Sequence, residues 1–158
     1  MRSGRSIAGR PTSSPDVPHY GQGMTRFVID PLTLVHLAED DLLTVNPAHQ
    51  LVAPSSIRSQ ALDLLLRRVR SGTLTEQEAL QLHERITELK MRLLGDRVSR
   101  RAAWRIAMDH DWSTVLDAEY LAVAKLQADA LVTLDPELAR KAAGVVPLAK
   151  VTDVKEGS

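Results

Sequence analysis

The sequence predicts an α/β domain in which a mainly parallel central sheet is flanked by helices. Short runs of β-favouring residues alternate with longer segments whose apolar residues recur at helical spacing, a pattern typical of parallel sheets covered on both faces. Two of the short runs end in aspartate followed by proline, which suits a strand that passes directly into a helix. The 158 residues are enough for one domain with one hydrophobic core.

The chain is expected to have three parts. Residues 1–23 are rich in serine, glycine, proline and arginine and show no apolar period, so we expect a disordered tail. Residues 24–150 contain the strand and helix patterns and are expected to form the domain. Residues 151–158 are expected to be a flexible carboxyl terminus.

The domain is predicted to begin with two strand–helix units. Residues 26–30 favour a strand, and the Asp-Pro pair at its end starts a helix that runs through residue 38. After a polar loop, residues 50–53 favour a second strand. A helix with apolar positions from Ile57 to Val69 is expected to follow it.

Three helices are predicted in the middle of the chain. Thr75 and Glu78 match a capping box, and the apolar period after them predicts a helix that continues until Gly95. A second helix is expected over residues 99–108, and a third from residue 113 or 114 through 126.

The last part of the domain is predicted to add two strands. Residues 130–134 read as a buried strand that ends at Asp135, where a short helix begins. Residues 145–148 favour a final strand, and the proline within it confines that strand to an edge of the sheet or to its end.

Composition limits the chemistry that the chain can use. Lys+Arg and Asp+Glu both total 20, so net charge gives no overall attraction to nucleic acid or to a membrane. The absence of cysteine excludes a disulfide framework and a thiolate metal site and suits a reducing cytoplasm. No apolar run approaches the roughly 20 residues needed to cross a bilayer, so we expect a cytoplasmic protein.

Aromatic residues are scarce. They make up 3% of the chain, which argues against a base-stacking platform of the kind that sequence-specific readers of single strands use. Trp104 and Trp112 flank the loop between two predicted helices and are expected to anchor it by packing.

Three aspartates are expected at one edge of the sheet. Asp30 and Asp135 each follow a predicted strand, and the carboxyl ends of parallel strands form the edge at which such folds bind ligands. Asp117 lies in the first turn of the helix that leads into the second of these strands. Three gathered carboxylates would repel one another by several kcal/mol at an effective dielectric constant near 20, and a hard divalent cation relieves that repulsion.

Each aspartate also has a simpler structural interpretation. Asp-Pro at a strand-to-helix turn is good N-cap chemistry, worth about 1 kcal/mol, and Thr114 with Asp117 matches a capping box. Taken singly, each residue is more often a cap than a ligand. The case for a metal site therefore depends on their convergence.

These segments resemble a known family. The stretches that carry the resemblance are Leu116-Asp117-Ala118-Glu119-Tyr120-Leu121-Ala122-Val123-Ala124 and Leu131-Val132-Thr133-Leu134-Asp135. Together they resemble the paired signature of PIN domains in VapC toxins. Residues 27–30 resemble the first PIN strand with its aspartate, and residues 52–55 resemble the start of the strand and helix that carry the family's glutamate. The resemblance covers about residues 26–148 and implies a PIN-like three-layer fold.

The resemblance also implies a site. It implies an acidic pocket of four carboxylates that binds Mg²⁺ or Mn²⁺, with Asp30, Asp117 and Asp135 as three of them. At the position of the family's glutamate this chain has Gln60, an amide that ligates hard cations more weakly. Asp63 lies one helical turn later and is a candidate replacement ligand. Thr133 matches a hydroxyl that the family often keeps near the metal, although a hydroxyl bonded to backbone is the plainer role.

RNA would need cationic contacts outside this acidic pocket. The candidate residues are arginines near the ends of predicted helices: Arg67, Arg68, Arg97, Arg100 and Arg101. Arginines near helix carboxyl ends also favour the helix dipole and solvation without any ligand, and this alternative stays open.

The resemblance implies a Mg²⁺-dependent endoribonuclease with a cognate antitoxin protein and a homodimeric assembly. The alternative is a catalytically weakened PIN-like module that binds RNA or protein without cleavage, and Gln60 motivates it. A phospho-acceptor receiver domain is a third possibility. Receivers generally place an acidic pair after the first strand, whereas Asp30 has no acidic neighbour.

Overall fold

The computed structural model describes residues 23–41 and 43–155. They contain five parallel strands in the order β3-β2-β1-β4-β5, so β1 is central. The strands are β1 (Thr25–Ile29), β2 (His49–Pro54), β3 (Arg92–Leu94), β4 (Ala130–Val132) and β5 (Leu148–Ala149). The expected tail at residues 1–22 lies outside the described residues.

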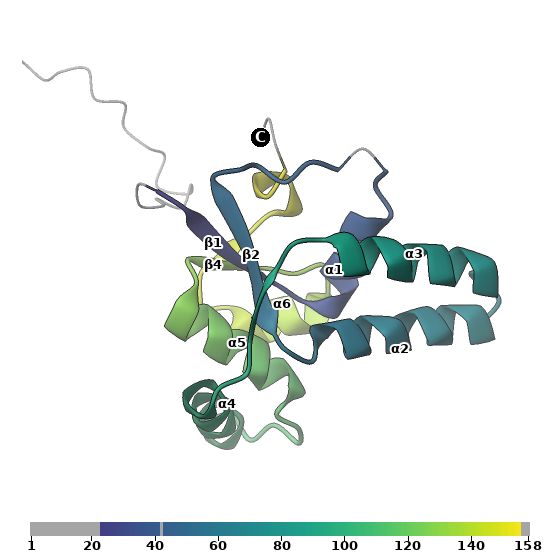
Figure 1. Cartoon of the computed structure of the whole chain (residues 1–158). Coiled ribbons are helices and arrows are strands. Elements are labelled where there is room, and N and C mark those ends of the chain that lie inside the picture. The colour runs from purple at the N-terminus through teal and green to yellow at the C-terminus, as the bar shows by residue number, and fades with distance from the viewer. Residues whose placement is uncertain (1–22, 42, 156–158) are drawn as a thin grey trace, which may run out of the picture.

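Six helices flank this sheet (Figure 1). They are α1 (Pro31–Ala38), α2 (Ile57–Arg70), α3 (Glu76–Glu88), α4 (Arg97–Asp109), α5 (Leu116–Gln127) and α6 (Pro136–Ala142). Helix α5 packs on β1 and β2, and α4 packs on the outer side of α5. Helices α2 and α3 form a hairpin that contacts α1 and projects to one side. The predicted α/β fold with a parallel, helix-flanked sheet is confirmed.

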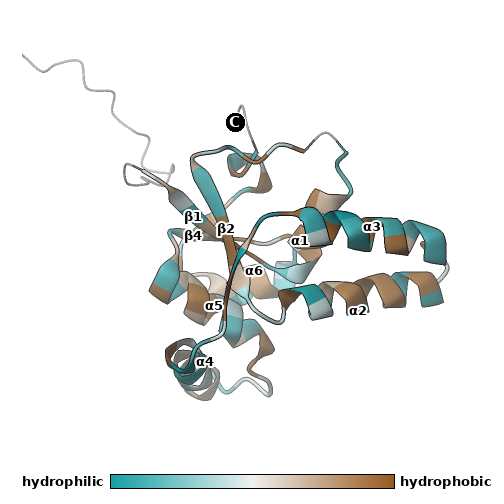
Figure 2. Ribbon diagram, viewed as in Figure 1, coloured by the Kyte–Doolittle hydropathy of each residue, from teal (hydrophilic) through white to brown (hydrophobic). Residues whose placement is uncertain are grey.

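The core lies along the central strands. Phe27, Val28 and Ile29 of β1 are fully buried, as expected for a strand covered by helices on both faces. The second half of β2 is also buried, and Figure 2 shows that strand changing from hydrophilic at its start to hydrophobic at its end. The buried ends of β1, β2 and β4 therefore fix the position of the sheet edge at which Asp30 and Asp135 lie.

Local signals predicted most helix starts correctly. Asp30 caps α1, with Pro31 as the first helical residue. The capping box between Thr75 and Glu78 is present at the start of α3 in both directions. The Thr114–Asp117 capping box is wrong, because α5 begins after Val115 and has no side-chain cap.

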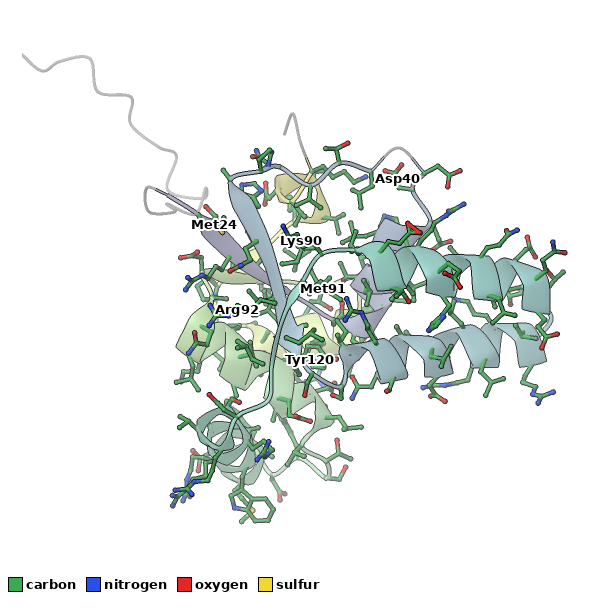
Figure 3. The ribbon with its side chains drawn as sticks, viewed as in Figure 1. Met24, Asp40, Lys90, Met91, Arg92 and Tyr120 are labelled. Carbon is green, nitrogen blue, oxygen red and sulfur yellow. The ribbon has the colours of Figure 1, made fainter. Side chains whose placement is uncertain are left out.

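The predicted continuation of α3 to Gly95 is also wrong. The helix ends at Glu88, Leu89 is extended, and Leu93 and Leu94 pair with β2 as the edge strand β3. Figure 3 shows Lys90, Met91 and Arg92 along this extended segment. A Cβ atom on Gly95 would lie 2.5 Å from Oγ of Ser55, so the glycine permits close packing beside β2. Pairing with β2 outweighed the helical spacing of the apolar residues.

The domain ends later than predicted. The last strand is β5, Leu148–Ala149, at the edge of the sheet as expected, and a 3₁₀ turn over Val151–Asp153 follows it. Val154 is completely buried, and Lys155 forms an antiparallel bridge with Val45. The expectation that the chain is flexible from residue 151 is therefore wrong for residues 151–155, and residues 156–158 lie outside the described part. Within the described ranges, no helix has the length and apolarity to cross a bilayer.

Candidate functional site

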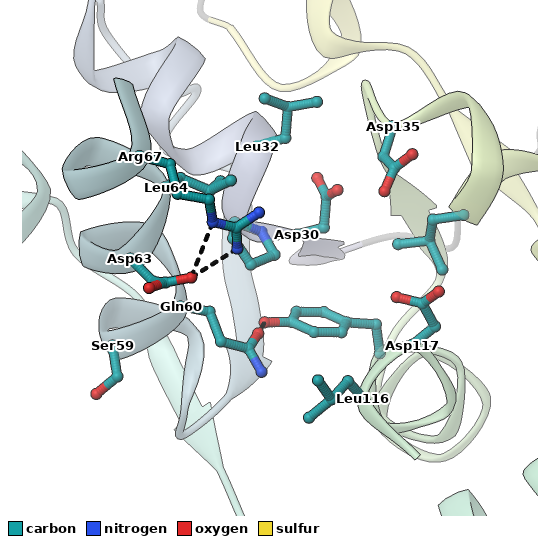
Figure 4. Close-up of a pocket in the computed structure, with 13 residues that line it drawn as sticks. Asp30, Leu32, Ser59, Gln60, Asp63, Leu64, Arg67, Leu116, Asp117 and Asp135 are labelled. Carbon is teal, nitrogen blue, oxygen red and sulfur yellow. Dashed lines mark hydrogen bonds and ion pairs between the residues drawn. The ribbon is translucent and has the colours of Figure 1, made fainter. Parts of the chain in front are cut away.

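Asp30, Asp117 and Asp135 line one cleft of about 560 Å³ (Figure 4). Asp30 follows β1 and Asp135 follows β4, and these strands are parallel neighbours, so their carboxyl ends lie side by side. Asp117 comes from the first turn of α5, which packs on β1. The sequence prediction that these segments converge on one sheet edge is thus consistent with the geometry.

Asp30 is the buried member of the three, with only 2% of its surface exposed. Its Oδ1 accepts a hydrogen bond from the Thr33 backbone N–H at 3.1 Å and another from the Thr33 hydroxyl. Burial raises the pKa of Asp30 above its ordinary value, and the negative charge of Asp135 raises it further, while the threonine hydrogen bonds act in the opposite direction. The fold therefore holds the Asp30 carboxylate in a buried position, where a bound cation would offset the cost of burying its negative charge.

Thr133 connects Asp30 with Asp135. Its hydroxyl donates to Oδ2 of Asp30 at 2.9 Å and accepts a hydrogen bond from the Asp135 backbone N–H at 3.0 Å. Asp135 in turn caps α6 by accepting from the Glu137 N–H at 2.9 Å. Asp30 and Asp135 are therefore helix caps and cleft residues at once, so the two interpretations drawn from the sequence do not exclude each other.

Asp117 has a protein cation beside it. Lys141 of α6 donates to Oδ2 of Asp117 at 2.8 Å, and its ammonium lies 4.9 Å from the centre of the Trp112 ring. Sequence reasoning missed this lysine. The available signal was a basic residue in the last turn of the short helix that Asp135 caps.

Gln60 is held by a tyrosine that sequence reasoning also missed. The Tyr120 hydroxyl donates to Oε1 of Gln60 at 2.5 Å, and both residues line the cleft. Burial is the largest cause that raises the pKa of Tyr120, followed by the negative charges of Asp30, Glu119 and Asp117. Tyr120 therefore stays a hydrogen-bond donor, and the Gln60 amide oxygen already has a partner.

Asp63, the candidate replacement ligand, lines the same cleft but is paired with an arginine. Its Oδ2 accepts hydrogen bonds from Nη2 and Nε of Arg67 at 2.6 and 3.1 Å (Figure 4). Both side chains are more than half exposed, so this pair is weak and a stronger cation can displace it.

The carboxylates of the cleft suit a hard cation that keeps part of its hydration shell better than a cation fully enclosed by protein ligands. Among the described residues, no group of three or more acidic or histidine side chains is close enough to hold one metal ion. A preformed site made by the three aspartates together is therefore not confirmed. Mg²⁺ usually keeps several waters and binds through one or two carboxylates, and the carboxylate oxygens of Asp30 and Asp135 at an open cleft meet that requirement.

The five candidate RNA-binding arginines do not form one surface. Arg67 lines the cleft, and Arg68 lies 3.6 Å from Glu39 in an ion pair. Arg97, Arg100 and Arg101 belong to α4, on the other side of α5 from α2. The structure thus separates cations beside the acidic cleft from cations on an outer helix.

Comparison with known proteins supports the architecture. No family model matches the chain, and no curated protein matches it. Among solved structures the chain is similar to PAE2754 from Pyrobaculum aerophilum, with a TM-score of 0.62 and 22% sequence identity over 82% of this chain and 93% of that chain. At this identity the likeness shows the α/β fold alone.

Proposed function

We propose that the protein is a Mg²⁺-dependent endoribonuclease of the PIN type, resembling VapC toxins. The observation that carries the proposal is the convergence of Asp30, Asp117 and Asp135, from three separate elements, on one open cleft at the carboxyl edge of a parallel sheet. One of these carboxylates is almost completely buried, which is costly unless a charge partner joins it.

Asp30 and Asp135 would hold the ion, and Asp117 would reach it through water. When bound, Mg²⁺ supplies an activated water and neutralises charge on a phosphodiester. Thr133 fixes the orientation of the Asp30 carboxylate through its hydroxyl. Arg67 at the rim of the cleft carries a guanidinium suited to a phosphate oxygen once Asp63 releases it.

The test is cleavage of single-stranded RNA by the purified chain with and without Mg²⁺. We expect cleavage that EDTA abolishes and that Asp30→Asn or Asp135→Asn reduces by about a hundredfold or more, judging from the 10 to 100-fold effects of outer-shell changes at metal sites. The matched control is Asp41→Asn, an exposed aspartate paired with Arg85 outside the cleft. Equal cleavage by all three variants would refute the proposed site.

A second candidate function is a PIN-like module that binds RNA or protein without cutting it. Two observations favour it. The Gln60 amide oxygen already accepts a hydrogen bond from Tyr120, and among the described residues no three acidic or histidine side chains lie close enough together to hold one metal ion. Binding of RNA that is unaffected by Mg²⁺, together with no cleavage, would select this function.

The partners belong to the same proposal. RNA is the proposed substrate, a cognate antitoxin the proposed inhibitor, and a cytoplasmic homodimer the proposed working form. These assignments depend on the resemblance of residues 26–148 to the family.

A further inference from the structure

Helix α4 presents an unusual outer face. Ser99, Ala103 and Ala107 are buried on its inner side, where the two alanines pack with Ala118 and Ala122 of α5. The opposite side, spaced as one helical stripe, carries Arg97, Arg101, Trp104 and Met108, and Arg100 and Arg105 flank it. We call these six residues the α4 stripe.

The apolar residues of the α4 stripe are open to solvent. Trp104 and Met108 are each 59% exposed, and neither belongs to a hydrophobic cluster. We predicted that both tryptophans pack and so anchor the loop between α4 and α5. Trp112 packs against the core, whereas Trp104 does not. An exposed tryptophan gives up the large free energy of burial that the residue usually supplies, which is typical of an interaction surface.

The four arginines of the α4 stripe differ in whether an acidic side chain lies beside them. Among the described residues, Arg97 and Arg101 form no ion pair. Arg100 donates to the Gly95 carbonyl and interacts electrostatically with Asp96. Arg105 has a single distant partner, Asp109, at 4.0 Å. Two guanidinium groups without an ion-pair partner thus lie on the same helical stripe as the exposed Trp104 indole.

We propose that the α4 stripe binds a single-stranded RNA segment, with a base stacked on Trp104 and phosphates on the arginines. Aromatic rings that stack on bases, together with cations that follow the backbone, are the general means of binding single strands. One tryptophan makes this a sequence-tolerant contact, in keeping with the scarcity of aromatic residues.

The position of α4 links this surface to the cleft, so the inference rests on the proposed function for its choice of RNA. The alanines of α4 pack against the turn of α5 that directly follows Asp117. Packed helix axes lie about 8–10 Å apart, and the α4 stripe faces away from α5, so an RNA strand that contacts both the stripe and the cleft would have to pass around α4. The stripe would thereby position the RNA beside the acidic cleft.

The test measures binding of a labelled single-stranded RNA of about 12 nucleotides, a length within the usual range of such sites, to the full chain in EDTA. Trp104→Ala should weaken binding roughly five- to 150-fold and reduce RNA-dependent quenching of tryptophan fluorescence to the part that Trp112 contributes. The double variant Arg97→Gln/Arg101→Gln should lower the log–log salt slope by about 1.4. An abasic oligonucleotide should bind wild type and Trp104→Ala alike.

Matched controls come from the α2–α3 hairpin. Leu80→Ala removes an apolar side chain that is 55% exposed, and Arg70→Gln removes an exposed arginine. Both should bind RNA as the wild type does. Unchanged affinity and quenching in Trp104→Ala would overturn the inference. The inference would also be overturned if substitutions in the α4 stripe abolished binding to phosphatidylserine vesicles, to an acidic protein or to a second copy of the chain and left RNA binding unchanged.

The outcome separates this inference from the proposed nuclease activity. RNA binding that depends on Trp104, without any Mg²⁺-dependent cleavage, would support the α4 stripe and refute the nuclease. Normal cleavage and binding by Trp104→Ala would refute the stripe and leave the nuclease standing.

Discussion

Replacing Asp30 with asparagine should make the metal-free protein more stable at neutral pH while it weakens the response to Mg²⁺. Asparagine has the same shape and is an equally good N-cap, so α1 keeps its start. The substitution removes a negative charge from a side chain that is only 2% exposed. Stability and metal binding should therefore change in opposite directions.

The magnitude follows from the partners of the Asp30 carboxylate. It accepts hydrogen bonds from the Thr33 N–H, the Thr33 hydroxyl and the Thr133 hydroxyl. In the asparagine variant the amide oxygen still accepts both hydrogen bonds from Thr33, whereas the amide nitrogen cannot accept from the Thr133 hydroxyl, so that bond is lost or reversed. We take about 1 kcal/mol for each of the three changed bonds, whereas burying an ion costs several kcal/mol. Because burial is the dominant influence and raises the pKa of Asp30, relief of the buried charge should exceed the loss. We expect a net gain of about 1–2 kcal/mol, or a Tm increase of about 3–8 °C.

The dependence on pH provides the check. A raised pKa means that folding favours the protonated acid, so this contribution to stability is complete below the ordinary value of 3.8 and is lost as pH rises through the raised pKa. The advantage of Asp30→Asn should therefore be small in acid and grow toward neutrality. Thermal melts across this range measure it, with Asp41→Asn as the exposed control.

Magnesium should reverse the order of stability. An ion at 100 times its Kd stabilises the wild type by about 2.7 kcal/mol, and Asp30→Asn should lose most of that gain. An asparagine variant that is less stable than wild type at neutral pH, by an amount that does not vary with pH, would contradict the account of Asp30.

Three further predictions concern the surroundings of the cleft. Gln60→Glu should increase Mg²⁺-dependent cleavage about tenfold or more, because it adds a carboxylate while the Tyr120 hydroxyl can still donate; an unchanged rate, with activity lost in Asp63→Ala, would instead identify Asp63 as the ligand. Lys141→Met should destabilise the metal-free protein by about 1–2 kcal/mol by leaving Asp117 without its cation, and melts with added Mg²⁺ should recover that loss; a loss that Mg²⁺ does not restore would show that the lysine matters only for packing. Thr75→Ala should lower the free energy of unfolding by about 1 kcal/mol without altering cleavage, because it removes only the cap of α3; denaturant unfolding and the RNA assay together measure this.

The amino-acid sequence by itself determined the α/β alternation and the local signals at chain reversals. Alternating apolar runs and Asp-Pro pairs identified β1, β4 and the starts of α1 and α6, because caps and strand burial depend on neighbouring residues. The same signals placed Asp30 and Asp135 at one edge of the sheet. A parallel sheet leaves little other choice for residues that follow its strands.

Only the tertiary structure decided which side chains meet across that edge. Helical spacing around Leu93 and Leu94 predicted a longer α3, but pairing with β2 provided backbone hydrogen bonds that local sequence could not reveal. Likewise, Lys141 reaches Asp117 and Tyr120 reaches Gln60 only after distant elements have packed. Local propensity depends on a few neighbouring residues, whereas contacts between residues tens of positions apart depend on how the whole chain packs. One such contact places Lys141 beside Asp117 and so changes the charge of the cleft.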